Sequence, residues 1–386
     1  PDHPVALSTR IKAADAAFAA VKDFYLSSRY ADARFAPDVC DFTFGNPHEM
    51  PLGGLVSAIR EHAIPQDKNW FAYKSSEEQP QSFLAEHVGR ELSLPFEPAD
   101  IALTGGAFAA ILVAFRLVLD AGDEAVFSEP AWFCYEPMLL AADCVPRKVT
   151  LAAIDAAIGP RTRLVIVNTP HNPTGRIYSR ETLQELAELL ERASKRIGRR
   201  IYLLSDEPYR RLRFDGRGFD TPASIYPWTF ISYSYGKVLL APGQRVGYLA
   251  ISPLMPAPER NAHQDAMFGA QMAMGWCFPN AVMQYSLPAL ETLTIDRTAL
   301  ERRRDKLLRA LGDAGYSTLR PEGTFYLWSQ WPKGDPERFW NALADRNVFV
   351  MPGSVMASPG HFRISLTASD DMVERALPHF AEAVRG

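Results

Sequence analysis

The stretch "RLVIVNTPHNPTGRIYSRETLQELAELLERASKRIGRRIYLLSDEPY", residues 163–209, decides the fold. It begins with RLVIVN (163–168) and contains RIYLLS (200–205), two short apolar runs that are typical of buried strands. Between them, Ser179–Ile197 has the period of an amphipathic helix and opens with a Ser followed two residues later by a Glu. A strand, a helix and a second strand in this order predict a parallel pair joined by a helical crossover.

The same pattern recurs along the middle of the chain, where four more short apolar runs each end at a turn signal. A helical pattern, AFAAILVAFRLVL, follows the first of them. Near-continuous apolar strands suit a sheet that is buried on both faces. We therefore predict an α/β fold with a mainly parallel sheet and helices on both faces. The four runs are DIALT (100–104), EAVFS (124–128), TFISY (229–233) and GYLAIS (247–252).

The pattern changes from about residue 280 onward, where a long charged helix, DRTALERRRDKLLRALGDAG, comes first. The segments GTFYLW, FWNALADRNVFVMPG and HFRISLT follow it and predict a smaller α+β domain. We predict three parts of the chain. They are an N-terminal segment (1–45) that packs with the small domain, a large domain (46–279) and the small domain itself (280–386).

Composition narrows the class of protein. The net charge is −4, from 41 basic and 45 acidic residues, which gives no electrostatic reason to expect nucleic acid or a membrane surface as partner. The four cysteines are far apart and form no C-x-x-C pair, so neither a zinc site nor a disulfide framework is predicted. No uncharged apolar run approaches the roughly 20 residues that span a bilayer. We expect a cytoplasmic protein that binds small molecules.

Polar residues follow the predicted strands, and in open α/β sheets ligands bind beyond the carboxyl ends of strands. Gly105 and Gly106 precede a helix whose first amides can hold a phosphate, although a plain tight turn is the alternative. Asn172 lies in a turn fixed by two prolines and a glycine, which would hold its amide with little freedom. Asp206 comes directly after a buried strand, where a carboxylate is costly unless a cation or a protonated ring pairs with it.

Lys237 is the one lysine in SYSYGKVLLAPGQRVGY (232–248), and Arg245 follows it eight residues later. A desolvated lysine beside other cations has a lowered pKa and becomes an amine nucleophile that can form a Schiff base. Taken alone, a surface lysine is the more common interpretation. The combination with the preceding motifs gives Lys237 a chemical role.

With the motifs NTPHNPTG, SDEPY, SYGKVLLAPGQRVGY, PEGTFYLW and HFRISLT in this order, the chain resembles the class I and II aminotransferases. These are pyridoxal-phosphate enzymes of fold type I, and the resemblance covers essentially the whole chain. It implies a homodimer that binds pyridoxal 5'-phosphate. It also implies an activity that moves an amino group between an L-amino acid and a 2-oxo acid by a ping-pong mechanism.

The resemblance also implies roles for single residues. Lys237 matches the lysine that holds the cofactor as an internal aldimine and then serves as general base and acid. Asp206 matches the carboxylate that keeps the pyridine nitrogen protonated, and Asn172 and Tyr209 match the donors to the phenolic oxygen. Trp132 matches the aromatic residue that stacks on the ring. The implied phosphate anchors are Arg245, Ser234 and the backbone of Gly106, Ala107 and Phe108.

For the substrate, the resemblance implies that Arg363 grips the α-carboxylate, together with Asn172 and the backbone of Gly45. Tyr73 matches a tyrosine that reaches the phosphate of the neighbouring subunit's cofactor. Some positions depart from the family pattern. Gly236 replaces the usual Ser before the lysine, and Glu78 and Phe83 stand where a Gly and an Arg are expected. The motifs place no second substrate-binding arginine, so dicarboxylate specificity is not predicted.

Other functions remain open on the same residues. The scaffold also serves pyridoxal-phosphate-dependent lyases, decarboxylases and cyclases, because the fold does not fix the reaction. A non-catalytic ligand-sensing domain is a more remote alternative, and no helix-turn-helix or basic arm supports it. A nicotinamide dehydrogenase is disfavoured because no G-x-G-x-x-G motif follows a strand.

Overall fold

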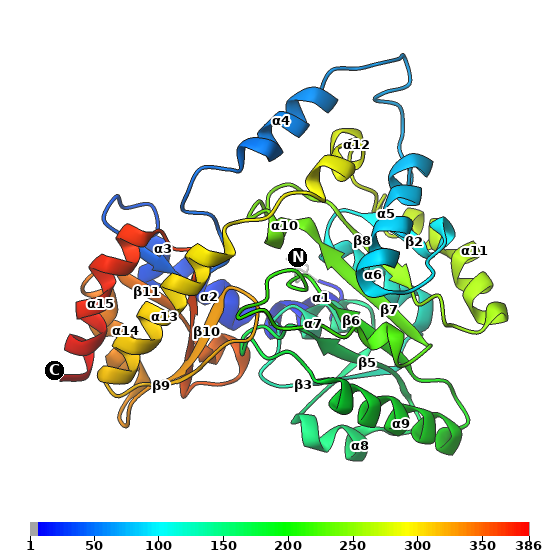
Figure 1. Cartoon of the computed structure of the whole chain (residues 1–386). Coiled ribbons are helices and arrows are strands. Elements are labelled where there is room, and N and C mark those ends of the chain that lie inside the picture. Colours follow the sequence, from blue (N-terminus) through cyan, green and yellow to red (C-terminus); the bar gives the residue numbers. More distant parts are fainter. Residues whose placement is uncertain (1–6, 386) are drawn as a thin grey trace, which may run out of the picture.

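The computed structural model describes residues 7–385 and contains two β-sheets side by side (Figure 1). One is seven-stranded, in the order β2-β8-β7-β6-β5-β3-β4, and the other is five-stranded, in the order β1-β11-β12-β10-β9. Residues 1–6 of the predicted N-terminal segment, and Gly386, lie outside the described residues. Within 7–385, no helix combines the length and the apolar character that crossing a membrane requires.

The seven-stranded sheet is parallel except for β8, which runs antiparallel to both of its neighbours. This confirms the predicted α/β fold with a mainly parallel sheet. All six strands expected in this region are present, with small shifts at their ends. The seventh, β4, has the sequence VPRKV and was not predicted because its charged, partly exposed residues give no apolar run. The strands are β2 (Ile101–Thr104), β3 (Glu124–Ser128), β4 (Val145–Val149), β5 (Thr162–Asn168), β6 (Tyr202–Asp206), β7 (Thr229–Ser234) and β8 (Gly247–Ile251).

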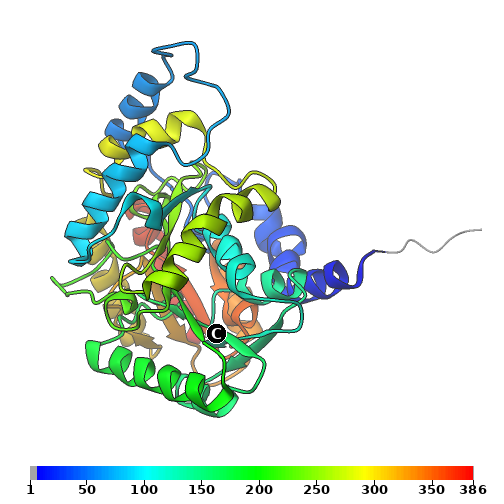
Figure 2. The same cartoon turned by 90° about the vertical axis from the view of Figure 1, so that its right-hand side faces the viewer.

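Helices cover both faces of this sheet, as predicted (Figure 1, Figure 2). Apolar side chains of α6, α7 and α11 form one core with it, while α8 and α9 form another core on the opposite face. The side chain of Ser179 accepts a hydrogen bond from Thr182 N and caps α9, whose buried stripe includes Leu183, Leu186 and Leu190. The α-helices between residues 53 and 290 are α4 (Gly53–His62), α5 (Glu78–Leu92), α6 (Ala107–Val118), α7 (Tyr135–Ala141), α8 (Ile154–Ala157), α9 (Arg180–Ile197), α10 (Tyr235–Val238), α11 (Ala257–Ala273) and α12 (Ala281–Leu290).

Both ends of the chain contribute to the five-stranded sheet, because β1 pairs in parallel with β11. Its strands are β1 (Cys40–Phe42), β9 (Ser317–Leu319), β10 (Tyr326–Gln330), β11 (Val348–Pro352) and β12 (His361–Ser365). The remaining helices are α1 (Thr9–Ala17), α2 (Ala19–Ser27), α3 (Arg29–Ala33), α13 (Arg297–Asp313), α14 (Pro336–Ala344) and α15 (Asp370–Arg385).

Helices α1 and α12 pack away from the five-stranded sheet. Helix α1 lies against α7, and its Arg10 forms an ion pair with Asp143 at 3.1 Å. Helix α12 lies against α4, beside the seven-stranded sheet (Figure 1). The boundaries at residues 45 and 279 stay predictions.

Candidate active site

The antiparallel strand β8 brings several sequence motifs to one edge of the seven-stranded sheet. Its first residue, Gly247, pairs with Thr104 at the end of β2 and with Ser234 at the end of β7. A β-carbon at Gly247 would lie 2.1 Å from the carbonyl oxygen of Tyr233, so only glycine fits here. The glycine turn after β2, Arg245 before β8 and Lys237 after β7 therefore meet at this edge.

A cavity opens where these segments meet. It brings together nine of the predicted site residues, and Asn168, Ile111, Pro208, Gly236 and Pro242 complete its wall. Sequence reasoning missed Asn168 as a site residue, although a polar residue that ends an apolar strand was the same signal that identified Asp206. The nine predicted residues are Ala107, Phe108, Trp132, Asn172, Asp206, Tyr209, Ser234, Lys237 and Arg245.

Asp206 is a buried carboxylate that lacks a cation. Ser232 Oγ donates to its Oδ1 at 2.7 Å, and Tyr135 OH donates to its Oδ2 at 2.5 Å. Within residues 7–385, no ion pair within 4.0 Å joins Asp206 to a basic side chain. Burial raises the pKa of Asp206 to about 6, against the opposing effect of these two hydrogen bonds. A bound cation would relieve this cost of burial.

The residues around the start of α6 form a cradle for an anion. Gly106 has φ +87° and precedes the first residue of the helix, and a β-carbon on it would lie 2.7 Å from Nη2 of Arg245. Arg245 donates through Nη1 to the carbonyl oxygen of Pro242 at 2.7 Å, and burial lowers its pKa. Ser234 Oγ, which accepts a hydrogen bond from Gly236 N at 3.3 Å, lines the same cavity. Free helix amides, a guanidinium and a hydroxyl together suit a phosphate.

Lys237 lies on the short helix α10, beside two aromatic rings. Its Nζ is 5.6 Å from the ring centroid of Tyr209 and 5.9 Å from that of Phe325. In the described part of the chain it forms no ion pair within 4.0 Å. A β-carbon at Gly236 would lie 3.1 Å from Cα of Pro242, so a larger residue before the lysine would require the two segments to move apart by a few tenths of an ångström.

The five-stranded sheet adds a buried cation through Arg363 on β12. The side chain is 2% exposed, and it donates through Nη1 to Asn172 Oδ1 and through Nη2 to Thr43 O, both at 2.9 Å. Its guanidinium carbon lies 3.8 Å from the ring centroid of Tyr326, while Nε has no hydrogen-bond partner among residues 7–385. Gly45 lies beside this group, because a β-carbon there would be 2.8 Å from the Tyr326 hydroxyl. The predicted carboxylate-binding residues are thus gathered around Asn172.

Two other predicted residues lie in different settings. Trp132 lines the cavity and packs edge-to-face on Phe108, with ring centroids 4.6 Å apart. Tyr73 is 91% exposed, does not line this cavity and contacts Trp276 instead. The two departures from the family pattern near Tyr73, Glu78 and Phe83, both belong to α5.

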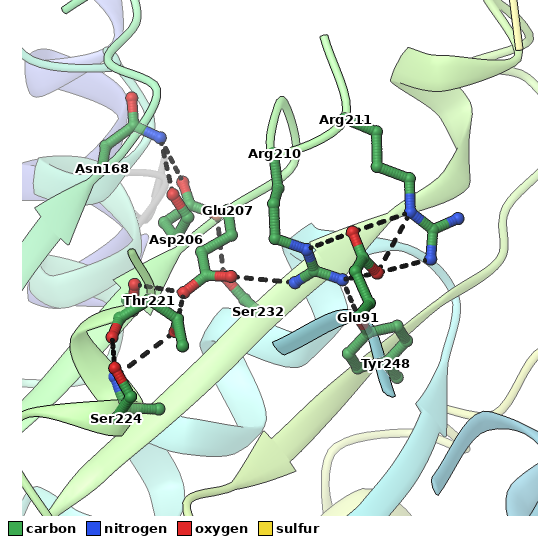
Figure 3. A network of polar contacts seen from close by, with 12 residues as sticks. Glu91, Asn168, Asp206, Glu207, Arg210, Arg211, Thr221, Ser224, Ser232 and Tyr248 are labelled. Atoms are coloured by element: carbon green, nitrogen blue, oxygen red, sulfur yellow. Dashed lines mark hydrogen bonds and ion pairs between the residues drawn. The ribbon is translucent and has the colours of Figure 1, made fainter. Parts of the chain in front are cut away.

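A buried network of charges lies behind Asp206 (Figure 3). The adjacent Glu207 accepts hydrogen bonds from Arg210 Nη1 at 2.8 Å and from Thr221 Oγ1 at 2.6 Å. Glu91 on α5 in turn binds both Arg210 and Arg211. Glu207 and Arg210 are three residues apart in the sequence, but nothing in the sequence indicates that Glu91 joins them. These pairs keep the loop after β6 rigid beneath the cavity.

Comparison with known proteins agrees with this geometry. Residues 37–380 match the family described as aminotransferase class I and II. The aspartate/prephenate aminotransferase of Thermus thermophilus is 30% identical over 370 residues, which cover 90% of this chain and 91% of that protein. Mouse kynurenine–oxoglutarate transaminase 1 is 28% identical over 322 residues, which cover 75% of this chain and 74% of that protein.

Solved structures give the same result. An amino transferase from Eubacterium rectale superposes with a TM-score of 0.84 at 26% identity, covering 98% of this chain and 96% of that chain. The aspartate aminotransferase of Thermus thermophilus with maleate has a TM-score of 0.79 at 27% identity, with 98% and 100% covered. The chain therefore belongs to the class I and II aminotransferases, and it is an enzyme that transfers amino groups with pyridoxal phosphate, the cofactor of that family.

Proposed function

We propose that the cavity at the edge of the seven-stranded sheet holds pyridoxal phosphate on Lys237, with the ring nitrogen on Asp206. One observation supports this most strongly: the charges of the site lack partners within the described chain. Asp206 has no cation, and Lys237, Arg245 and Arg363 have no carboxylate within 4.0 Å. A molecule with a protonated ring nitrogen and a phosphate, together with a substrate carboxylate, supplies each missing charge.

Each group around the cavity then has a task. The bound cofactor supplies an electron sink for the pair left when the Cα–H bond of the amino acid breaks. Lys237 Nζ takes that proton as general base and returns it as general acid. Asp206 holds the ring nitrogen in its protonated form, and Asn172 and Tyr209 hydrogen-bond the phenolic oxygen. Trp132 covers the ring. The phosphate is held by Arg245, Ser234 and the backbone of Gly106, Ala107 and Phe108.

For the substrate, we propose that Arg363 binds the α-carboxylate, beside Asn172 and the backbone of Gly45. The wall of the cavity near α6 is apolar and includes Phe108 and Ile111. In the described chain its lining cations are Lys237 and Arg245, which are already assigned. We therefore infer a preference for amino acids whose side chains carry no charge.

We also propose a homodimer in which Tyr73 reaches the phosphate site of the partner. Tyr73 lines an open hollow with other apolar side chains, and several of them are exposed in a single chain. A second copy would cover this surface and remove it from water. The hollow is lined by Phe71, Ala72, Tyr73, Lys74, Trp276, Phe278, Pro279, Asn280 and Ala281.

The test is the Lys237→Ala variant, measured by the absorbance of the bound cofactor when an amino acid and then a 2-oxo acid are added. We expect turnover to fall by about 10⁴-fold or more, because the general acid and base is lost. Lys148→Ala removes a lysine at the surface of β4, in an ion pair with Glu136, and should leave turnover unchanged. Unchanged activity in Lys237→Ala would contradict the proposal. Release of pyruvate and ammonia without a 2-oxo acid would instead identify a lyase.

A panel of amino acids tests the substrate preference in the same assay. We expect amino acids with apolar or aromatic side chains to convert the cofactor faster than aspartate or glutamate does. Faster conversion by the two acidic amino acids would overturn this part of the proposal.

A further inference from the structure

Tyr135 is a buried phenol directly beneath the cavity. It begins α7, and its backbone N–H donates to Trp132 O at 3.3 Å, which closes a tight turn between the two residues. This turn places Trp132 in the cavity wall and Tyr135 behind it, with ring centroids 5.2 Å apart. The Tyr135 hydroxyl donates to Oδ2 of Asp206 at 2.5 Å. The established activity assigns no task to this contact.

The Asp206 carboxylate is held from both sides. Ser232 donates to Oδ1 from the neighbouring strand β7, while Tyr135 donates to Oδ2. Asn168 Nδ2 makes a longer contact with the same Oδ2, at 3.5 Å (Figure 3). The backbone of Asp206 is fixed as well, because it pairs in register with Asn168 on β5 and with Ser232 on β7. Since the main chain is held, the direction of the carboxylate depends on these donors, of which Tyr135 and Ser232 make the short hydrogen bonds.

Of the groups that surround Asp206, Tyr135 is its strongest hydrogen-bond donor. Burial raises the pKa of Tyr135 well above its usual value, so the residue stays a neutral phenol that donates. Glu207 opposes ionisation of Asp206, but the Arg210 ion pair at 2.8 Å compensates its charge. Lys237 favours ionisation from a greater distance, and Tyr209 faces Asp206 from the loop after β6. Among these groups, Tyr135 has the greatest effect in lowering the pKa of Asp206.

We propose that Tyr135 is a positioning residue that keeps Asp206 ionised and directed at the ring nitrogen of the cofactor. This inference rests on the proposed function, in which Asp206 binds that nitrogen. When a buried charge loses a hydrogen-bond donor, the binding of a ligand that pairs with this charge weakens by about 10- to 100-fold. The loss must depend on the ring nitrogen, because Tyr135 acts only through Asp206.

The experiment compares how tightly two cofactors bind to the cofactor-free protein. Dissociation constants are measured for pyridoxal phosphate and for its analogue with carbon in place of the ring nitrogen. We expect Tyr135→Phe to weaken the binding of pyridoxal phosphate by about tenfold or more and to leave the binding of the carbon analogue unchanged. Tyr226→Phe is the matched control. It removes another buried hydroxyl, which donates to Ile201 O at 2.6 Å, and should change neither constant.

The outcomes separate this inference from the proposed function. If Tyr135→Phe weakened the binding of both cofactors equally, Tyr135 would have a merely structural role. If it weakened the binding of neither, Tyr135 would have no role. Either result would overturn the inference. Failure of the wild-type protein to bind pyridoxal phosphate would overturn the proposed function instead. Circular dichroism checks the fold of the variant. If Tyr135→Phe does not fold, Tyr135→His, which keeps a donor, should bind pyridoxal phosphate almost as well as the wild type. A loss common to both cofactors in Tyr135→His would overturn the inference.

Discussion

At the scale of single residues, the site is built from charges that no residue of the described chain neutralises. Among residues 7–385, Asp206 is buried without a cation, and Arg363 is buried with an unpaired Nε–H and no carboxylate. Leaving charges in this state costs folding free energy. A ligand that pairs with these charges offsets this cost, so binding of the cofactor and the substrate should stabilise the fold.

The raised pKa of Asp206 predicts how the stability of the cofactor-free protein depends on pH. The value of about 6 lies above the ordinary value for an aspartate, so the folded state binds this proton more tightly than the unfolded state does. The stabilising effect is complete below about pH 4 and is lost as the pH rises through about 6. Relative to Asp206→Asn, the wild type should lose about 3 kcal/mol of unfolding free energy over this interval.

Urea unfolding at a series of pH values between about 4 and 8 measures this loss. The Asp206→Asn variant is the control, because it cannot titrate at this position while the rest of the chain titrates as before. Stability curves that run parallel for the two proteins would show that Asp206 has an ordinary pKa.

At the scale of elements, the start of α6 is shaped by its contact with the segment before β8. Gly105 and Gly106 are neighbours in the sequence but have different surroundings. A β-carbon on Gly106 would meet Arg245, whereas one on Gly105 would meet no atom within 4 Å. Only Gly106 has a positive φ, +87°, which side chains other than glycine rarely adopt.

We therefore predict that Gly106→Ala weakens binding of pyridoxal phosphate by about tenfold or more, because the added methyl group displaces Arg245 from the phosphate site. Gly105→Ala should bind as the wild type does. Affinity for pyridoxal, which has no phosphate, should differ little between Gly106→Ala and the wild type. The same loss of affinity in both glycine variants would contradict the assignment of Arg245 to the phosphate.

At the scale of the whole molecule, the site lies between two sheets, and a separate apolar hollow lies outside its cavity. Arg363 from the five-stranded sheet donates a hydrogen bond to Asn172 beside the seven-stranded sheet. The substrate binding that we propose for Arg363 would therefore depend on how the two sheets are held together. The exposed apolar side chains around Tyr73 and Trp276 mark the surface that we assign to the dimer.

Trp276→Glu places a charge in this surface and should convert the dimer into a monomer in sedimentation experiments, because an unpaired charge at an apolar interface is costly. Affinity for pyridoxal phosphate should fall with it, since Tyr73 would no longer reach the partner's site. Leu319→Glu is the control: Leu319 is an exposed apolar residue on β9, distant in sequence, and its replacement should change neither property. A wild-type monomer at micromolar concentration would refute the dimer.

The sequence by itself determined the α/β class, six strands of the large sheet and the motif residues that line the cavity. These features are local, because each strand is a short apolar run and each polar residue follows directly after one. Parallel strands end at the same edge of a sheet, so Asn172, Asp206 and Lys237 could be expected to meet there.

Only the tertiary structure decided the antiparallel direction of β8 and the presence of β4. It also decided which distant residues contact Asp206 and Asn172. Tyr135 is 71 residues from Asp206 in the sequence, and Arg363 is 191 residues from Asn172. The close approach of Gly236 to Pro242 also became visible only in three dimensions. Contacts of this kind depend on how distant segments pack, and hydrophobic periodicity carries no information about that packing.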